Sequence, residues 1–174
     1  MNLPNAISLG RLLAVPVTVW LMLNGRWALA FWLFVLAGVS DGIDGYLARR
    51  TNQRTVLGHY LDPLADKSLL VAVFVTLAIG GQVPSWLVLL IVTRDFLLVA
   101  VALLLYMTGQ PLKIDPLPIS KLNTVAQLVL AATVLLRLGY GLGDELIDAA
   151  LMAAVTLTTV LSGAGYIRAL AGRS

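Results

Sequence analysis

Long apolar segments alternate with short polar breaks along most of the chain. Six of them are long enough to cross a bilayer, which takes about 20 apolar residues in a helix. They cover residues 6–24, 27–48, 56–80, 84–107, 118–138 and 145–170. Glycine, asparagine and proline separate the segments, as expected of turns, and no strand-like alternation is present. The pattern predicts an all-α integral membrane bundle of six transmembrane helices, formed as one domain over residues 1–174.

The composition supports a membrane protein. Hydrophobic residues make up 59% of the 174 positions and charged residues 12%, whereas soluble domains carry about 25% charged residues. The chain has no cysteine, which excludes disulfides, thiol nucleophiles and thiolate metal sites.

The basic residues follow the positive-inside rule, so the net charge of +3 does not indicate a nucleic-acid partner. Six spans place both termini on one side of the membrane. Eight of the twelve basic residues fall on that side: Arg11, Arg49, Arg50, Arg54, Lys113, Lys121, Arg168 and Arg173. Only Arg26 and Arg137 fall on the opposite side, so we expect the termini at the cytoplasmic face. Because Arg11 interrupts the first apolar run, we expect this segment to be retained as a span.

Four aspartates, Asp41, Asp44, Asp62 and Asp66, occupy two neighbouring predicted helices. A carboxylate near lipid costs about 2.5–3.5 kcal/mol on insertion scales. Spacings of three and four residues put each pair on one helix face, and oxygen ligands in this number suit Mg²⁺ or Mn²⁺. Two such ions are a recurrent clamp for displacement at phosphorus. The alternative is a set of structural ion pairs, for which only Arg49 and Lys67 lie near.

The spacing of these residues resembles that of the CDP-alcohol phosphatidyltransferase family. The shared frame is Asp-x-x-Asp-Gly-x-x-Ala-Arg, then eight residues, then Gly-x-x-x-Asp-x-x-x-Asp. The chain matches it at Asp41, Asp44, Gly45, Ala48, Arg49, Gly58, Asp62 and Asp66. Three further stretches resemble most closely the CMP-forming cardiolipin synthases and, less closely, the phosphatidylglycerophosphate synthases. They are Leu3-Pro4-Asn5 with Ser8 and Arg11, Thr93-Arg94-Asp95, and Ile119 to Thr124.

The resemblance implies a homodimeric enzyme of the bacterial inner membrane with its active site at the cytoplasmic face. It would transfer a phosphatidyl group from CDP-diacylglycerol to a hydroxyl and release CMP. The four aspartates would hold two divalent cations, Mg²⁺ or Mn²⁺, and Asp66 would also be the general base. The residues implied to bind the cytidine and its diphosphate are Asn5, Ser8, Gly45, Ala48, Arg49 and Gly58. Arg94 and Lys121 would bind the anionic group of the acceptor.

Each of these secondary roles has an ordinary structural alternative. The small residues Gly45, Ala48 and Gly58 also suit close helix packing, and Arg49 suits a positive-inside anchor. Asn5 and Ser8 suit a helix cap, and Lys121 suits a side chain that reaches the headgroups.

Arg94 lies within a predicted span, where its structural alternative is pairing with an acid. Asp95 is adjacent in sequence, but it points about 100° away around the helix.

The acceptor is predicted from one substitution. Phosphatidylglycerophosphate synthases commonly carry Gly-Lys-x-Lys-Thr where this chain has Ser120-Lys121-Leu122-Asn123-Thr124. Asn123 replaces the second lysine, which suits the single charge of phosphatidylglycerol better than the dianion of glycerol 3-phosphate. We therefore expect cardiolipin synthesis, with phosphatidylglycerophosphate synthesis as the alternative. A divalent-cation transporter is a remote alternative, because the chain shows neither the paired repeats nor the broken helices of transporters.

Overall fold

The computed structural model describes the backbone of residues 3–51, 56–107 and 118–171, and the side chains of residues 10, 12–40, 67–100, 118–165 and 168. Within these ranges the chain forms six α-helices and no strand. They are α1 (Leu3–Leu23), α2 (Trp27–Thr51), α3 (Val56–Ile79), α4 (Ser85–Met107), α5 (Pro118–Tyr140) and α6 (Glu145–Ala171). The predicted all-α class is confirmed, and each predicted segment coincides with one helix to within about three residues at either end, the usual uncertainty of a boundary predicted from sequence.

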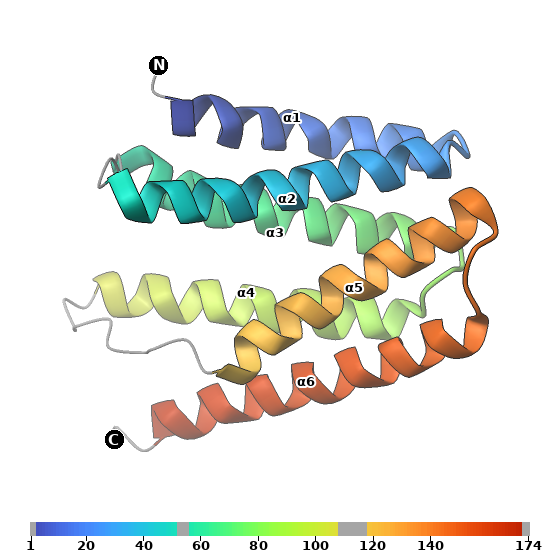
Figure 1. The fold of residues 1–174 in the computed structure, drawn as a ribbon. Helices are drawn as coiled ribbons and strands as arrows, with labels where there is room; N and C mark the ends of the chain where they lie inside the picture. The colour runs from blue at the N-terminus through green and yellow to red at the C-terminus, as the bar shows by residue number, and fades with distance from the viewer. Residues whose placement is uncertain (1–2, 52–55, 108–117, 172–174) are drawn as a thin grey trace.

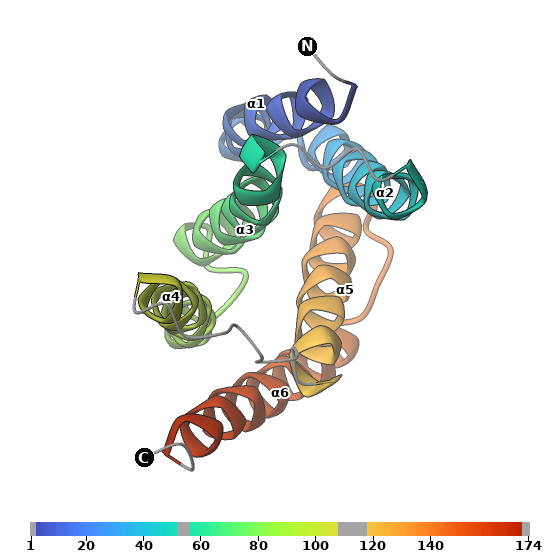
Figure 2. The ribbon, with the colours of Figure 1, turned by 90° about the vertical axis from the view of Figure 1, so that its left-hand side faces the viewer.

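The helices form a ring when viewed along their axes. Contacts join α1 to α2, α2 to α5, α5 to α6, α6 to α4, α4 to α3 and α3 back to α1 (Figure 2). The start of α1, the end of α2, the start of α3 and both ends of the chain lie at the same end of the molecule (Figure 1). The helices carrying the predicted site therefore converge at one end.

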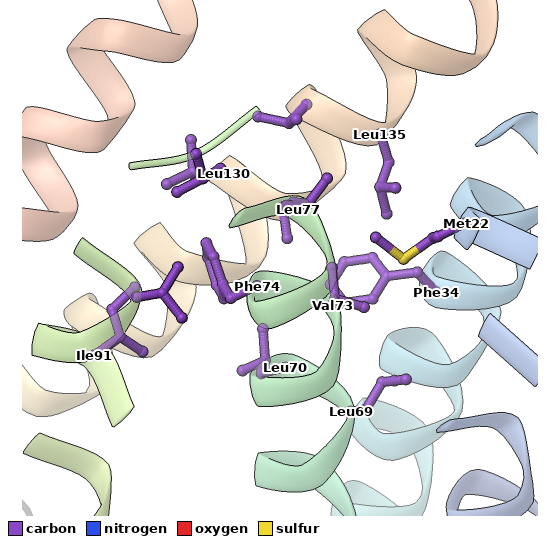
Figure 3. Packing of buried hydrophobic residues seen from close by; sticks show 14 of the residues in the cluster. Met22, Phe34, Leu69, Leu70, Val73, Phe74, Leu77, Ile91, Leu130 and Leu135 are labelled. Carbon is purple, nitrogen blue, oxygen red and sulfur yellow. The ribbon is translucent and has the colours of Figure 1, made fainter. Parts of the chain in front are cut away.

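The third helix supplies the centre of the hydrophobic core. Val73, Phe74 and Leu77 on α3 are fully buried. Figure 3 shows Phe74 beside Leu130 of α5, and Val73 on the side nearer α1 and α2. One helix thus packs against several neighbours, and this packing fixes where its first half, with Asp62 and Asp66, is held.

Two of the turns opposite the chain termini end their helices through a glycine. At the end of α1, Gly25 has a φ of 70°, and Arg26 N donates to Leu21 O at 2.8 Å. At the end of α3, Gly81 has a φ of 69°, and Gln82 N donates to Leu77 O at 2.9 Å. Both are Schellman ends, which favour glycine because a Cβ is strained at positive φ.

Helices α2 and α5 approach most closely at that same end. A Cβ added to Gly139 on α5 would lie 2.8 Å from both the N and the Cα of Ala28 on α2. Beside this contact, the Trp32 indole Nε1 donates to the Tyr140 hydroxyl at 2.8 Å. Glycine at position 139 is thus required by backbone contact between the two helices.

Among the described residues, Pro118–Tyr140 and Glu145–Gly165 are long and apolar enough to cross a membrane, judged by length and composition alone. Shorter apolar helical stretches occur at Leu12–Leu23, Trp27–Ser40 and Lys67–Ile79. The arrangement of six helices is therefore observed, while six membrane crossings stay a prediction.

We expect Gly139→Ala to destabilise the protein, because the new methyl group meets helix backbone that cannot rotate away. Overpacking of this kind costs about 1–3 kcal/mol. The measurement is the midpoint of thermal unfolding in detergent. Gly38→Ala on α2 is the matched control, since a Cβ there meets nothing within 4 Å. An unfolding midpoint for Gly139→Ala equal to that of Gly38→Ala would show that α2 and α5 are not in backbone contact.

Candidate active site

The aspartates of the shared frame lie on two consecutive helices. Asp41 and Asp44 are in the second half of α2, and Asp62 and Asp66 are in the first half of α3. Their side chains are outside the described residues, so the metal-ligand and general-base roles stay predictions. Four carboxylates are a hard oxygen donor set, and this chemistry fits Mg²⁺ or Mn²⁺.

The residues predicted to bind the nucleotide lie on α2 and α3, which carry the aspartates, and on α1. Asn5 and Ser8 are on α1, Gly45, Ala48 and Arg49 on α2, and Gly58 on α3. Their side chains also lie outside the described residues. The backbone places their helix ends at one end of the molecule (Figure 1), and their contacts with a nucleotide stay predictions.

Directly after Asp66, the described side chains of α3 begin with Lys67, which belongs to a charge cluster with Arg94 and Asp95 of α4. The Lys67 ammonium lies 2.8 Å from Oδ2 of Asp95 on α4, and NH1 of Arg94 donates to Oδ1 of Asp95 at 2.7 Å. The Arg94 and Asp95 side chains are 5% and 7% exposed, whereas that of Lys67 is 30% exposed. One carboxylate thus faces two cations.

Arg94 also joins three helices. Its NH2 donates to the hydroxyls of Ser120 on α5 and Ser162 on α6, each at 2.6 Å. Its Nε is buried and has no partner among the described residues. The angular argument against a pair with Asp95 was wrong, because the long arginine side chain spans the 100° between the two positions. Arg94 would have to exchange one of these bonds to reach an acceptor, and its binding role stays a prediction.

The two other positions of interest on α5 face different surroundings. Lys121 is exposed, consistent with either of its two readings. Asn123 is fully buried, and its Oδ1 accepts hydrogen bonds from the hydroxyls of Thr158 and Thr159 on α6 at 2.8 and 2.9 Å. Asn123, which stands where phosphatidylglycerophosphate synthases commonly have a second lysine, therefore serves the packing of α5 against α6. This weakens the argument from charge for phosphatidylglycerol as the acceptor.

A second ion pair closes the opposite end of the bundle. Arg137 Nε donates to Oδ2 of Asp148 at 2.6 Å, and Arg137 NH2 donates to Gln82 Oε1 at 3.2 Å. The Arg137 and Asp148 side chains are 22% and 4% exposed. This pair ties α5 and α6 to the turn between α3 and α4, far along the bundle from Lys67.

Sequence reasoning missed the network formed by Lys67, Asp95, Ser120 and Ser162. A signal for it was present, because Lys67 and Asp95 are opposite charges placed inside two consecutive predicted spans. Each charge alone is costly in a membrane, so the sequence contained a reason to expect Lys67 and Asp95 to form an ion pair. The two serines carry no such signal, since a serine in a helix can satisfy its hydroxyl through its own backbone.

Comparison with known proteins identifies the family. The CDP-alcohol phosphatidyltransferase profile matches residues 1–162, which is most of the chain. The protein belongs to the CDP-alcohol phosphatidyltransferase family. The predicted resemblance is confirmed, and the match gives no support to a transporter.

Curated relatives in this family carry two names. A chloroplastic CDP-diacylglycerol–glycerol-3-phosphate 3-phosphatidyltransferase of Oryza sativa is 37% identical over 95% of this chain and 56% of its own length. The human cardiolipin synthase (CMP-forming) is 32% identical over 95% of this chain and 60% of its own length. The Bacillus subtilis CDP-diacylglycerol–glycerol-3-phosphate 3-phosphatidyltransferase is 35% identical, over 95% of this chain and 93% of its own length.

The chain thus spans little more than half of the rice and human relatives but nearly all of the bacterial one. Both acceptor specificities occur among the names, so the comparisons do not separate cardiolipin synthesis from phosphatidylglycerophosphate synthesis.

We expect Asn123→Lys to destabilise this phosphatidyltransferase. The substitution introduces a cation at a fully buried position, where an unpaired charge costs several kcal/mol even after relaxation, on the order of 3–5. Asn123→Leu is the control, because it removes the same hydrogen bonds without adding charge. The readout is the thermal unfolding midpoint in detergent. If both variants unfold at the same temperature, the side chain at position 123 is not enclosed by α6.

Proposed function

We propose that the protein transfers a phosphatidyl group from CDP-diacylglycerol to the hydroxyl of phosphatidylglycerol, giving cardiolipin and CMP. The observation that carries the proposal is the complete aspartate frame in a family member, on helix ends that converge at one end of the bundle (Figure 1). The transfer is a displacement at phosphorus. The acceptor oxygen forms a bond to the phosphorus of the phosphatidyl group, and the bond from that phosphorus to the CMP oxygen breaks.

The residues of the chain divide the work of this reaction. Asp41, Asp44, Asp62 and Asp66 would hold two divalent cations. When bound, such ions neutralise a diphosphate and make an acceptor hydroxyl more acidic. Asp66 takes the proton of that hydroxyl. Arg49 binds a diphosphate oxygen through its planar fork, and Asn5, Ser8, Gly45, Ala48 and Gly58 leave room for the nucleotide along α1, α2 and α3.

The choice of phosphatidylglycerol rests on charge. The start of α5 carries one lysine of the two found in phosphatidylglycerophosphate synthases, and a phosphodiester needs less positive charge than a monoester. The alternative, transfer to glycerol 3-phosphate, is favoured by two observations. Relatives with that name are 35% and 37% identical to this chain, and Asn123 packs against α6 rather than marking a reduced charge at the site.

We place the bundle across the membrane with all six helices, with the termini and aspartates at the cytoplasmic face. Large apolar side chains are exposed on every helix, such as Leu13, Leu36, Val75, Leu89, Val125 and Leu157. The exposed aromatic residues Trp20, Trp86 and Tyr140 lie near the helix ends opposite the chain termini, where an interfacial belt is expected. We also propose that the protein forms a homodimer.

The reaction and its acceptor are tested together. Purified protein receives labelled CDP-diacylglycerol with Mg²⁺ or Mn²⁺ and equal amounts of phosphatidylglycerol and glycerol 3-phosphate, and the lipid products are separated. We expect CMP release with cardiolipin as the main product. Phosphatidylglycerophosphate as the main product would refute the acceptor and keep the reaction class, and absence of CMP release with either acceptor would refute both.

The metal site makes a separate prediction. Chelation should abolish CMP release, and readdition of the cation should restore it. Asp62→Asn and Asp66→Asn should each lower the rate at least about 10²-fold, the scale of a lost general base. Asp144→Asn at the start of α6 is the control, since that carboxylate accepts from the Leu146 backbone N at the far end of the bundle. Turnover near that of wild type in both test variants would contradict the metal assignment.

A further inference from the structure

The charge cluster on α3 and α4 holds one cation more than its carboxylate needs. Asp95 is already paired with Arg94 at 2.7 Å, and Lys67 adds a second cation at 2.8 Å. The cluster of Lys67, Arg94 and Asp95 therefore carries a net charge of +1. Among the described side chains no further carboxylate lies beside this charge, and a charge at this depth of a membrane protein marks a substrate path or a further partner. A purely structural ion pair between α3 and α4 would need only one of the two cations.

The surplus charge is presented by Lys67 rather than by Arg94. Both terminal nitrogens of Arg94 are engaged with Asp95, Ser120 and Ser162, and its side chain is 5% exposed. An ammonium group has three donors, and the described contacts of Lys67 use one of them, toward Asp95. Its side chain is 30% exposed. Of the two cations, Lys67 is thus the one open to a ligand.

The position of Lys67 makes that exposure informative. The residue lies near the middle of α3 (Val56–Ile79), and Asp95 holds its ammonium toward α4 at 2.8 Å. A lysine at such depth is unstable against lipid unless it faces a wet cavity or a polar partner. Its neighbour in sequence is Asp66, the proposed base, and consecutive Cα atoms lie about 3.8 Å apart.

From these contacts we infer that Lys67 binds the anionic phosphate of the acceptor and that Asp95 is the positioning residue that holds its ammonium in place. Arg94 is the clamp that fixes Asp95 to α5 and α6. The inference rests on the proposed function and adds the residue that recognises the acceptor. The ligand class is a glycerol phosphate, either the diester of phosphatidylglycerol or the monoester of glycerol 3-phosphate. Binding such a group compensates the surplus charge of the cluster and brings the acceptor beside Asp66.

The test uses a pair of substitutions that leaves no carboxylate without its lysine. In the double variant Lys67→Gln/Asp95→Asn, the amide oxygen introduced at position 95 can still accept from Arg94 NH1, and the amide NH₂ there can donate to the new glutamine oxygen at position 67. These bonds compensate only in part for the carboxylate that the buried Arg94 loses. The single variant Lys67→Gln, which keeps the pair of Arg94 and Asp95, is therefore measured in the same way. The matched control is Arg137→Gln/Asp148→Asn, which neutralises the ion pair at the opposite end of the molecule. A thermal unfolding scan of each purified variant verifies folding.

Two measurements are made on wild type and on both double variants. The first is the rate of CMP release. It is measured with the acceptor concentration varied at saturating CDP-diacylglycerol, and then with the CDP-diacylglycerol concentration varied at saturating acceptor. The second is the rise in unfolding midpoint produced by glycerol 3-phosphate or by short-chain phosphatidylglycerol, which requires no turnover. We expect Lys67→Gln/Asp95→Asn to raise the acceptor KM at least about tenfold, the scale of one lost charge-assisted hydrogen bond. The KM for CDP-diacylglycerol should stay unchanged, and the acceptor-induced rise in midpoint should vanish.

The control should retain the wild-type acceptor KM and the wild-type rise in midpoint. An unchanged acceptor KM in the test variant, or equal rises in KM for both substrates, would overturn the role of Lys67 while leaving the proposed reaction intact. If wild type releases no CMP, the proposed reaction fails, and the acceptor-induced rise in midpoint then decides the inference alone. Loss of that rise in the test variant but not in the control supports it, and equal rises or no rise in wild type refute it.

Discussion

A charge in the interior of a helical bundle needs a partner supplied by the protein, and this constraint organises the centre of the molecule. Asp95 satisfies two cations at once, and Arg94 extends the same network to serines on α5 and α6. The cluster joins α3, α4, α5 and α6. Removing one partner from such a network is expected to cost more than the network's net contribution, because a buried charge would be left alone.

The network also sets the level at which the fifth helix begins. Ser120, in the first turn of α5, meets Arg94 near the middle of α4. From there α5 runs obliquely across the bundle to α2 (Figure 1), where Gly139 allows backbone contact with Ala28. The start of α5 is thus fixed by the hydrogen bond from Arg94 to Ser120, and its end by the close backbone contact that Gly139 allows. Between them, the apolar face of α5 packs on Phe74 and its neighbours (Figure 3).

The two ends of the bundle differ in chemistry. The end with the turns after α1, α3 and α5 is closed by glycine turns, aromatic side chains and the pair of Arg137 with Asp148. The end with the termini carries the aspartate frame on α2 and α3. Lys67 lies on α3 between the buried residues Leu69, Leu70, Val73, Phe74 and Leu77 and the half that carries Asp62 and Asp66.

The sequence by itself determined the class, the six helices and the family. Apolar segments of bilayer length allow only a helical solution, and glycine and asparagine at the turns end helices through local backbone geometry. The aspartate frame is a spacing within and between adjacent helices, so it is readable without tertiary information. Only the tertiary structure decided how distant positions meet: that Arg94 pairs with Asp95 and reaches two other helices, that Asn123 packs against α6, and that Lys67 reaches across to α4. These outcomes depend on which helix faces which and on the reach of flexible side chains, and neither is encoded in local periodicity.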